Sequence, residues 1–347
     1  KNKLALIGLV LLQYALWTDF SLILNSVLTI LAIGLVGYEL GIFLLPKKTR
    51  FWQTSIGSMA FLASLEILLS GVYWFFYIDT PLISLSLFVL IVMILFLPKK
   101  QNKQNNITFP KNMLTWAYLP VLIILLSDAI LFLKLYSKRL GDTIISPWTL
   151  VGPKFFITFF LTTLLLLFIL QHKKIHTAIK GLLTTGHFFL IASVAFIIYK
   201  NGFGFDPFIH QATEQWILNN GVITPKVPYY IRQYMLVMFG HLTTSLPIRL
   251  LDHALVPLGA AMTLPTMLYY VLKQKNKYTW LSIALLPLLP LSFFIVTTPN
   301  NFALLLAILT GLWIWHEFDT QPSLYNTSRL IGLLLVGSTT VVHAFIG

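Results

Sequence analysis

The sequence contains no cysteine, which excludes disulfide bonds and thiolate metal sites. It is also poor in charge: 10% of its 347 residues are Asp, Glu, Lys or Arg, against about 25% in soluble domains. Hydrophobic residues make up 57% of the chain. A chain of this composition cannot cover itself with polar groups, which indicates that lipid is its solvent.

Acidic residues are particularly few: 11 Asp and Glu stand against 24 Lys and Arg, and the net charge is +13. A nucleic-acid-binding protein gathers its basic residues on one exposed face. Here they lie in short runs between apolar stretches, as in the loops of a membrane protein. The sequence therefore predicts membrane lipids, and no nucleic acid, as its surroundings.

Long hydrophobic runs predict an all-α polytopic membrane protein with about 11 transmembrane helices. A helix rises about 1.5 Å per residue, so about 20 apolar residues cross the hydrocarbon core. The runs of suitable length lie near 4–18, 21–45, 54–78, 81–98, 114–136, 152–171, 181–199, 250–272, 279–296, 301–316 and 330–347.

The distribution of basic residues predicts a cytoplasmic N-terminus. If the spans alternate from such an N-terminus, every densely basic loop falls on the cytoplasmic side, as the positive-inside rule expects. The basic residues of these loops are Lys1, Lys3, Lys47, Lys48, Arg50, Lys99, Lys100, Lys103, Lys111, Lys173, Lys174, Lys180, Lys273, Lys275, Lys277 and Arg329.

One connection, residues 200–249, is too long for a simple turn, and the same alternation places it on the extracytoplasmic face. Asp206-Pro207 predicts a helix start, since Asp caps helices and Pro suits the first helical position. Gly221 predicts the end of that helix. A second interfacial or re-entrant element is expected over 229–246.

The first of these helices is expected to be amphipathic and to lie in the membrane interface. His210 and Glu214, four residues apart, share a side that we expect to face water. The apolar side, expected to face the membrane, consists of Phe205, Phe208, Ile209, Ala212, Trp216 and Ile217.

The stretch GFGFDPFIHQATEQWILNNGVITP (202–225) resembles the first outer loop of GT-C glycosyltransferases, and most closely that of oligosaccharyltransferase catalytic subunits. In those loops an Asp-Pro-aromatic start opens a helix that ends in Asn-Gly-like residues. The segment TPNNFA (298–303) resembles a short outer turn before a span of the same superfamily, and His343 resembles a further recurrent position.

The resemblance covers roughly residues 181–347 and divides the chain. Residues 1–180 are expected to form an N-terminal six-helix membrane bundle, and 181–347 a GT-C-like transmembrane module with an outer catalytic loop at 200–249. In oligosaccharyltransferases the acidic loop follows the first span, whereas here it follows the seventh. Because the chain ends inside an apolar run, we expect the module to be truncated at its C-terminus.

The resemblance implies a glycosyltransferase that moves a sugar from a polyprenyl-phosphate-linked donor to a glycan, lipid or protein acceptor at the extracytoplasmic face. Asp206 corresponds to the catalytic outer-loop aspartate, which accepts a proton or binds a metal ion that neutralises the leaving phosphate. Glu214 and His210 are further catalytic candidates. The candidate donor-phosphate ligands are Arg232, Arg249, Lys226 and His241.

Metal dependence stays open. A divalent cation, Mg²⁺ or Mn²⁺, is the cofactor that the resemblance implies, with Asp206 as a candidate ligand. Metal-dependent relatives supply a second acidic motif from a later outer loop, but residues 297–301 contain no acid. Either Glu214 replaces it, or the missing ligands are expected beyond Gly347.

Each candidate also has a structural interpretation. Asp206 can be a helix cap alone, Glu214 a solvated helix residue and His210 a headgroup contact. Arg232 and Arg249 can be interfacial anchors. His241 can cap the second element.

A rival interpretation is a transporter or flippase that uses the intramembrane carboxylates Glu66 and Asp128, since such groups are costly and by default functional. These two residues have no Lys or Arg partner within their spans and are expected to be neutral and hydrogen-bonded between helices. A transporter of this kind shows internal repeats, and none is evident here. A non-catalytic scaffold is the third reading if Asp206 is only a cap.

Overall fold

The computed structural model describes residues 3–18, 21–45, 48, 50–98, 118–141, 146–172, 175–226, 230–272, 279, 283, 286, 292–319 and 327–343. Within these ranges the chain forms thirteen α-helices and no β-strand. The prediction of an all-α protein is confirmed for this part of the chain.

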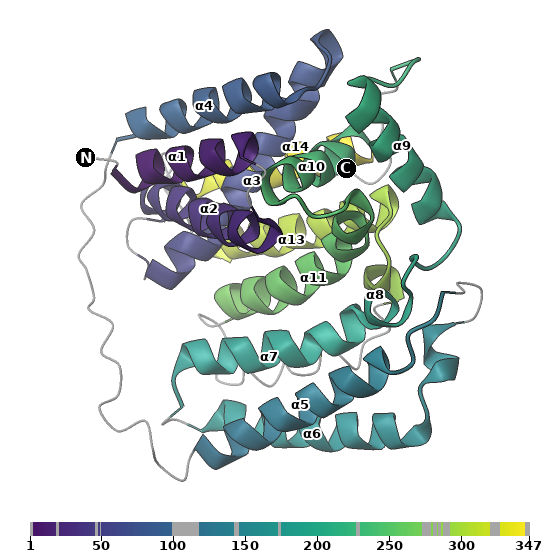
Figure 1. Cartoon of the computed structure of the whole chain (residues 1–347). Helices are drawn as coiled ribbons and strands as arrows, with labels where there is room; N and C mark the ends of the chain where they lie inside the picture. Colours follow the sequence, from purple (N-terminus) through teal and green to yellow (C-terminus); the bar gives the residue numbers. More distant parts are fainter. Residues whose placement is uncertain are drawn as a thin grey trace. The chain divides into compact units, whose positions relative to one another are not determined.

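The helices follow the hydrophobic runs closely (Figure 1). Those of the first half are α1 (Lys3–Trp17), α2 (Leu22–Leu44), α3 (Arg50–Phe75), α4 (Thr80–Phe96), α5 (Leu119–Tyr136), α6 (Pro153–Gln171), α7 (Thr177–Ala192) and α8 (Val194–Ile198). Those of the second half are α9 (Asp206–Asn220), α10 (Ile231–Thr244), α11 (Ile248–Leu272), α13 (Pro299–Asp319) and α14 (Arg329–Val342). The short 3-10 helices η2 (Pro147–Leu150) and η4 (Ser292–Ile295) precede α6 and α13.

Every predicted span except the ninth coincides with a helix, and the seventh is interrupted at Ser193 between α7 and α8. Most of the ninth, at 279–296, lies outside the described residues, as do most of the basic loop residues and Tyr229.

Five helices, α2, α3, α5, α6 and α11, are long and apolar enough to cross a membrane. Large apolar side chains also stand on the outside of these helices: Ile23, Ile30 and Leu133 are all more than half exposed. Soluble monomers rarely expose contiguous apolar surface on this scale, whereas lipid-facing helices do. These are the features of a multi-pass helical membrane protein.

Contacts divide the chain into two compact units whose segments alternate along the sequence. Unit 1 comprises residues 1–106, 209–251 and 302–347, and unit 2 comprises 107–208 and 252–301. The expected division into an N-terminal bundle (1–180) and a GT-C-like module (181–347) is a division by function and stays a prediction.

Within unit 1, α2 and α3 meet through glycines. A Cβ on Gly41 of α2 would lie 1.9 Å from the carbonyl oxygen of Gln53, and one on Gly57 of α3 would lie 1.9 Å from that of Gly37. Gly37 and Gly41 are four residues apart and therefore share a face. Small residues with this spacing let membrane helices approach backbone to backbone.

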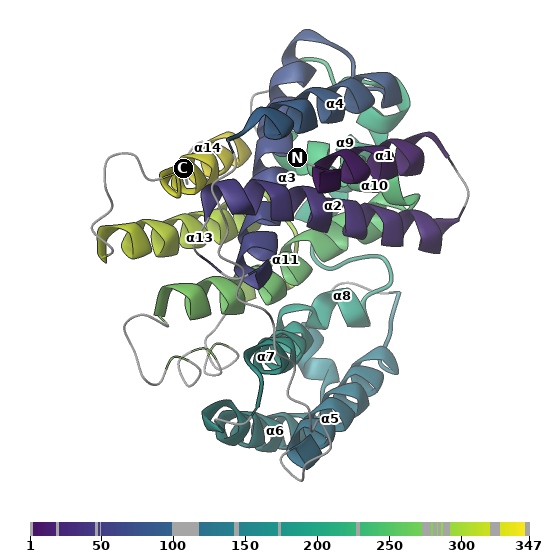
Figure 2. The ribbon, with the colours of Figure 1, turned by 90° about the vertical axis from the view of Figure 1, so that its left-hand side faces the viewer.

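Helix α10 is buried inside unit 1, where it packs against α1, α2, α3 and α14 (Figure 2). The Thr29 hydroxyl of α2 donates to the Thr243 carbonyl at 2.9 Å, and the Asn25 amide lies 3.3 Å from the Ser245 hydroxyl. The second element expected over 229–246 is therefore a helix, and it is buried within unit 1.

Unit 2 contains α5, α6 and α7 packed side by side (Figure 1). Leu131 and Leu135 of α5 share an apolar cluster with Phe155 and Phe159 of α6 and Leu190 of α7. The three helices bury their aromatic and aliphatic side chains together and leave other apolar residues, such as Ile157, on the outside.

Candidate functional site

Helix α9 forms where the Asp-Pro and Gly signals predict it. It begins at Asp206, whose side chain is on the exposed surface, and Pro207 is buried in its first turn. It ends at Asn220, and the Gly221 N–H donates to the Ile217 carbonyl at 2.7 Å. Gly221 has φ +74°, a conformation that glycine adopts without strain.

The polar side of α9 is buried in the protein and does not face water as expected. His210 and Glu214 are buried, with 7% and 0% exposure, whereas Phe205, Ile209 and Trp216 are at least half exposed. The prediction that the His210 and Glu214 side faces water is therefore wrong. His210 reaches a partner in the protein interior, whereas the exposed apolar side chains need no hydrogen-bond partner. Ile217, expected on the apolar side, is buried as well.

His210 belongs to a cluster of two histidines and two tyrosines in unit 1. Its Nδ1 lies 2.7 Å from the Tyr234 hydroxyl, and its ring packs edge-on against Tyr230 at 5.3 Å. Tyr230 also contacts the His343 ring at 5.8 Å. His343, singled out from the sequence by a separate likeness, thus shares a neighbour with His210.

Tyr230 holds this cluster together in an uncommon backbone conformation. It has φ +70° immediately before α10, a region that few residues other than glycine adopt. Its N–H donates to the Val342 carbonyl at the end of α14. Positive φ at a bulky residue persists only where its surroundings impose it, and such residues concentrate at functional sites.

Arg232, a predicted phosphate ligand, is 3% exposed and lies within unit 1. Its Nη1 donates to the Gly337 carbonyl of α14. Glu66 of α3 accepts a hydrogen bond of 2.8 Å from Ser338. Burial lowers the pKa of Arg232, and the charge of Glu66 opposes that shift. Glu66 thus has a cationic neighbour, which its own span did not offer, and the interfacial-anchor interpretation of Arg232 does not match its burial.

Lys226 caps the C-terminal end of α3. Its Nζ donates to the carbonyls of Tyr73 and Trp74 at 2.7 and 3.0 Å and lies 5.2 Å from the Tyr73 ring centroid. The last carbonyls of a helix have no partner inside the helix, and a cation satisfies both their hydrogen bonding and the helix dipole. This geometry gives Lys226 a structural role beside the predicted one.

His241 and Arg249 complete the predicted phosphate set. His241 Nδ1 lies 2.7 Å from the Leu246 carbonyl, across the turn where Ser245 has φ +60° and α10 ends. Arg249 is exposed in the first turn of α11. Of the four cationic or basic candidates, Arg249 is therefore the one whose side chain stands on the surface of its unit.

The turn at residues 298–301 is held by side-chain hydrogen bonds within unit 2. Thr298 Oγ1 accepts from the Asn301 N–H at 3.2 Å, which caps α13, and the Asn301 amide donates to the Val296 carbonyl. Thr297 Oγ1 accepts from the Val256 N–H, next to Pro257 in α11. A proline inside a helix disturbs the preceding hydrogen bonds, and Thr297 supplies a replacement acceptor.

Two buried ionisable residues of unit 2 were not predicted as site residues from the sequence. Asp252 and His253 follow Arg249 in α11 and are 0% and 9% exposed. Gly202, with φ +104°, lies against the His253 ring: a Cβ there would be 2.2 Å from Nε2. His253, Gly202 and Pro207 line one small pocket. An Asp-His pair inside an apolar run was the available signal.

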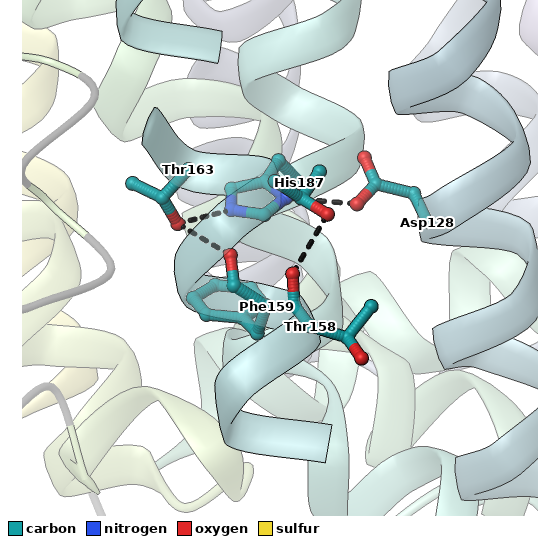
Figure 3. A network of polar contacts seen from close by, with 6 residues as sticks. Asp128, Thr158, Phe159, Thr163 and His187 are labelled. Carbon is teal, nitrogen blue, oxygen red and sulfur yellow. Dashed lines mark hydrogen bonds and ion pairs between the residues drawn. The ribbon is translucent and has the colours of Figure 1, made fainter. Parts of the chain in front are cut away.

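The second intramembrane carboxylate, Asp128 of α5, also has a partner (Figure 3). Its Oδ1 lies 2.8 Å from Nδ1 of His187 on α7, and Nε2 of His187 lies 2.8 Å from the Thr163 hydroxyl of α6. The expectation that Glu66 and Asp128 are hydrogen-bonded between helices is confirmed for both. Each lies in a network of its own, Glu66 in unit 1 and Asp128 in unit 2.

A divalent cation at Asp206 would need further oxygen or nitrogen ligands. In the part of the chain that the structure describes, no three His, Asp or Glu side chains gather around a common point. Asp206 therefore stays a candidate ligand from the resemblance alone.

Comparison of the chain with protein-family models, curated proteins and solved structures found no match. The likeness to GT-C glycosyltransferases therefore rests on the residues of the chain itself.

Proposed function

We propose that this protein is a membrane glycosyltransferase of GT-C type, with about eleven spans and a cytoplasmic N-terminus. It transfers a sugar from a polyprenyl-phosphate-linked donor to a glycan, lipid or protein acceptor at the extracytoplasmic face. The observation that carries the proposal is α9: an exposed carboxylate, Asp206, begins a helix whose outer side is apolar.

The chemistry explains why a carboxylate is needed at this place. The carrier lipid holds its phosphate at the membrane surface, so the reacting group must stand at the same depth. A helix with an apolar outer side lies in that interface. Phe205, Ile209 and Trp216 therefore set the depth at which the Asp206 carboxylate is presented.

In the proposed reaction the nucleophilic atom of the acceptor attacks C1 of the sugar, and the bond between C1 and the phosphate oxygen breaks. The phosphate leaves with the electron pair, and Asp206 accepts the proton of the acceptor as general base. Arg249 stays a donor-phosphate ligand that the sequence predicts, and its side chain is exposed. The substitution Arg249→Gln is then expected to raise the KM for the donor.

The decisive test is Asp206→Asn in a lipid-linked sugar transfer assay with membranes. Asn caps a helix as well as Asp does, so this substitution removes the charge while keeping the start of α9. Loss of transfer at normal expression is expected, and retained turnover would contradict the catalytic role.

Asp79 offers a matched control. It caps α4, which has a proline in its first turn, and its carboxylate accepts from the Leu82 N–H at 2.8 Å. Asp79→Asn should leave transfer unchanged. In a transporter, by contrast, activity would depend on Glu66 or Asp128 and would be indifferent to Asp206.

A further inference from the structure

The three packed helices of unit 2 each contribute one polar side chain to a chain of hydrogen bonds. Asp128 is in the middle of α5, Thr163 in the middle of α6 and His187 in α7. The His187 ring lies between the other two, with 2.8 Å on either side (Figure 3). None of these residues takes part in the proposed transfer reaction.

The number of hydrogens in this chain depends on the charge of His187. The Thr163 hydroxyl has one hydrogen, and it lies 2.9 Å from the Phe159 carbonyl as well as 2.8 Å from Nε2. If that hydrogen goes to Phe159, Nε2 must carry a proton to bond Thr163, while Nδ1 carries the one given to Asp128. The ring is then an imidazolium.

A neutral ring fits the same positions. With the Thr163 hydroxyl turned toward Nε2, that nitrogen accepts instead of donating, and Nδ1 still donates to Asp128. The Phe159 carbonyl keeps its ordinary place in the hydrogen bonding of α6. One proton on Nε2 and one hydroxyl rotation separate the two states, and neither leaves a polar atom of the ring without a partner.

The surroundings of the ring suit its charged state. The Phe159 ring stacks on it with 4.1 Å between centroids and 9° between planes, and the face of an aromatic ring attracts a cation. His187 is fully buried, which disfavours a charge on the ring, and the Asp128 carboxylate 2.8 Å away opposes that effect.

Few other charged groups belong to the elements packed against α7. These elements are α5, α6, α8 and η4. Besides Asp128, α5 carries Lys134 in its last turn and α6 carries Lys154 in its first, while α8 and η4 have no charged residue. On α7 itself, Lys180 donates to the Leu170 carbonyl. Asp128 is thus the charged group that His187 contacts.

We propose that Asp128, His187 and Thr163 form a proton-binding site within the membrane-spanning helices, in which His187 takes up a proton at Nε2 and becomes an imidazolium paired with Asp128. The uptake adds one positive charge next to a carboxylate and therefore ties α5, α6 and α7 more tightly together.

The test is ¹⁵N solid-state NMR of the full chain in lipid bilayers, with labelled histidine and His187→Gln to assign the signals of this ring among those of the 8 histidines. Between about pH 5 and pH 8, one ring nitrogen should stay protonated while the other gains a proton as the pH falls. A second nitrogen whose protonation does not change over that range overturns the proposal, whatever the variants do.

Asp128→Asn keeps an oxygen acceptor but removes the charge. The midpoint, meaning the pH at which the second ring nitrogen is half protonated, should then be lower, because the charge that favours a protonated ring is gone. Thr162→Val is the matched control, because the Thr162 hydroxyl donates to the Thr158 carbonyl and not to His187. It should leave the midpoint in place. An unmoved midpoint in Asp128→Asn, or an equal shift in Thr162→Val, refutes the site.

Discussion

The hydroxyl of Ser338 on α14 donates a 2.8 Å hydrogen bond to the Glu66 carboxylate on α3. Gly337, the residue before it, accepts from Arg232 of α10. Two neighbouring residues of α14 thus hold an acid and a base that come from two other helices. Glu66 and Arg232 are both almost completely buried, so their hydrogen bonds to α14 link three helices of unit 1.

Removal of one member of this pair should cost more than removal of both. Arg232→Met leaves a buried carboxylate without its cationic neighbour, and we expect unit 1 to lose about 3–5 kcal/mol of stability. Glu66→Gln combined with Arg232→Met should recover part of that loss. Denaturant unfolding in mixed micelles measures the four corners of this double-mutant cycle. Strict additivity would show that the two residues are not coupled.

The close contact of α2 and α3 leads to opposite expectations for two glycines. Gly41→Ala places a methyl group 1.9 Å from the Gln53 carbonyl oxygen, and the helices must separate, at a cost of about 1–3 kcal/mol. Gly71→Ala in α3 meets nothing within 4 Å and should gain up to about 1 kcal/mol in helix propensity. Thermal unfolding of the two variants compares the same chemical change at both positions. Similar effects would argue against a backbone contact at Gly41.

Replacement of Lys226 should change the stability of the protein more than it changes the KM for the donor. Lys226→Met removes the hydrogen bonds to the last carbonyls of α3 and should destabilise the protein by about 1–3 kcal/mol. Lys138→Met, at an exposed lysine, is the control and should have little effect. Unfolding and the KM for the donor are measured together. A raised KM at unchanged stability would instead support the prediction that Lys226 binds the donor phosphate.

The absence of cysteine makes the proposed topology directly testable. Single cysteines at Gln171 and Gln215, both exposed residues, have no background thiol to compete with them. A membrane-impermeant maleimide added to intact cells should label Gln215→Cys and spare Gln171→Cys until the membrane is opened. The reverse pattern would place the α9 loop in the cytosol and would remove the basis of the transferase proposal.

Local signals predicted the elements well. Asp206-Pro207 and Gly221 bracket α9 because capping and left-handed turns depend on a few neighbouring residues. The hydrophobic runs located the helices for the same reason, since the length needed to cross lipid is a property of each segment alone.

The partners of the polar residues could not be predicted in this way. Lys226 caps carbonyls about 150 positions earlier in the chain, and Glu66 meets Ser338 across 272 positions. The side of α9 that faces inward also depends on distant residues, because His210 hydrogen-bonds to Tyr234 on another helix. Amphipathicity specifies two sides of a helix but not which of them the protein covers.

The inward position of His210 makes the membrane part of the environment of α9 if the helix has the interface location proposed above. There the outer residues, among them Ile209 and Trp216, would contact the acyl chains, while His210 is tied to Tyr234. A thinner or thicker bilayer would then pull on the outer side while the inner side stays fixed, so we expect membrane composition to act on the histidine–tyrosine contact.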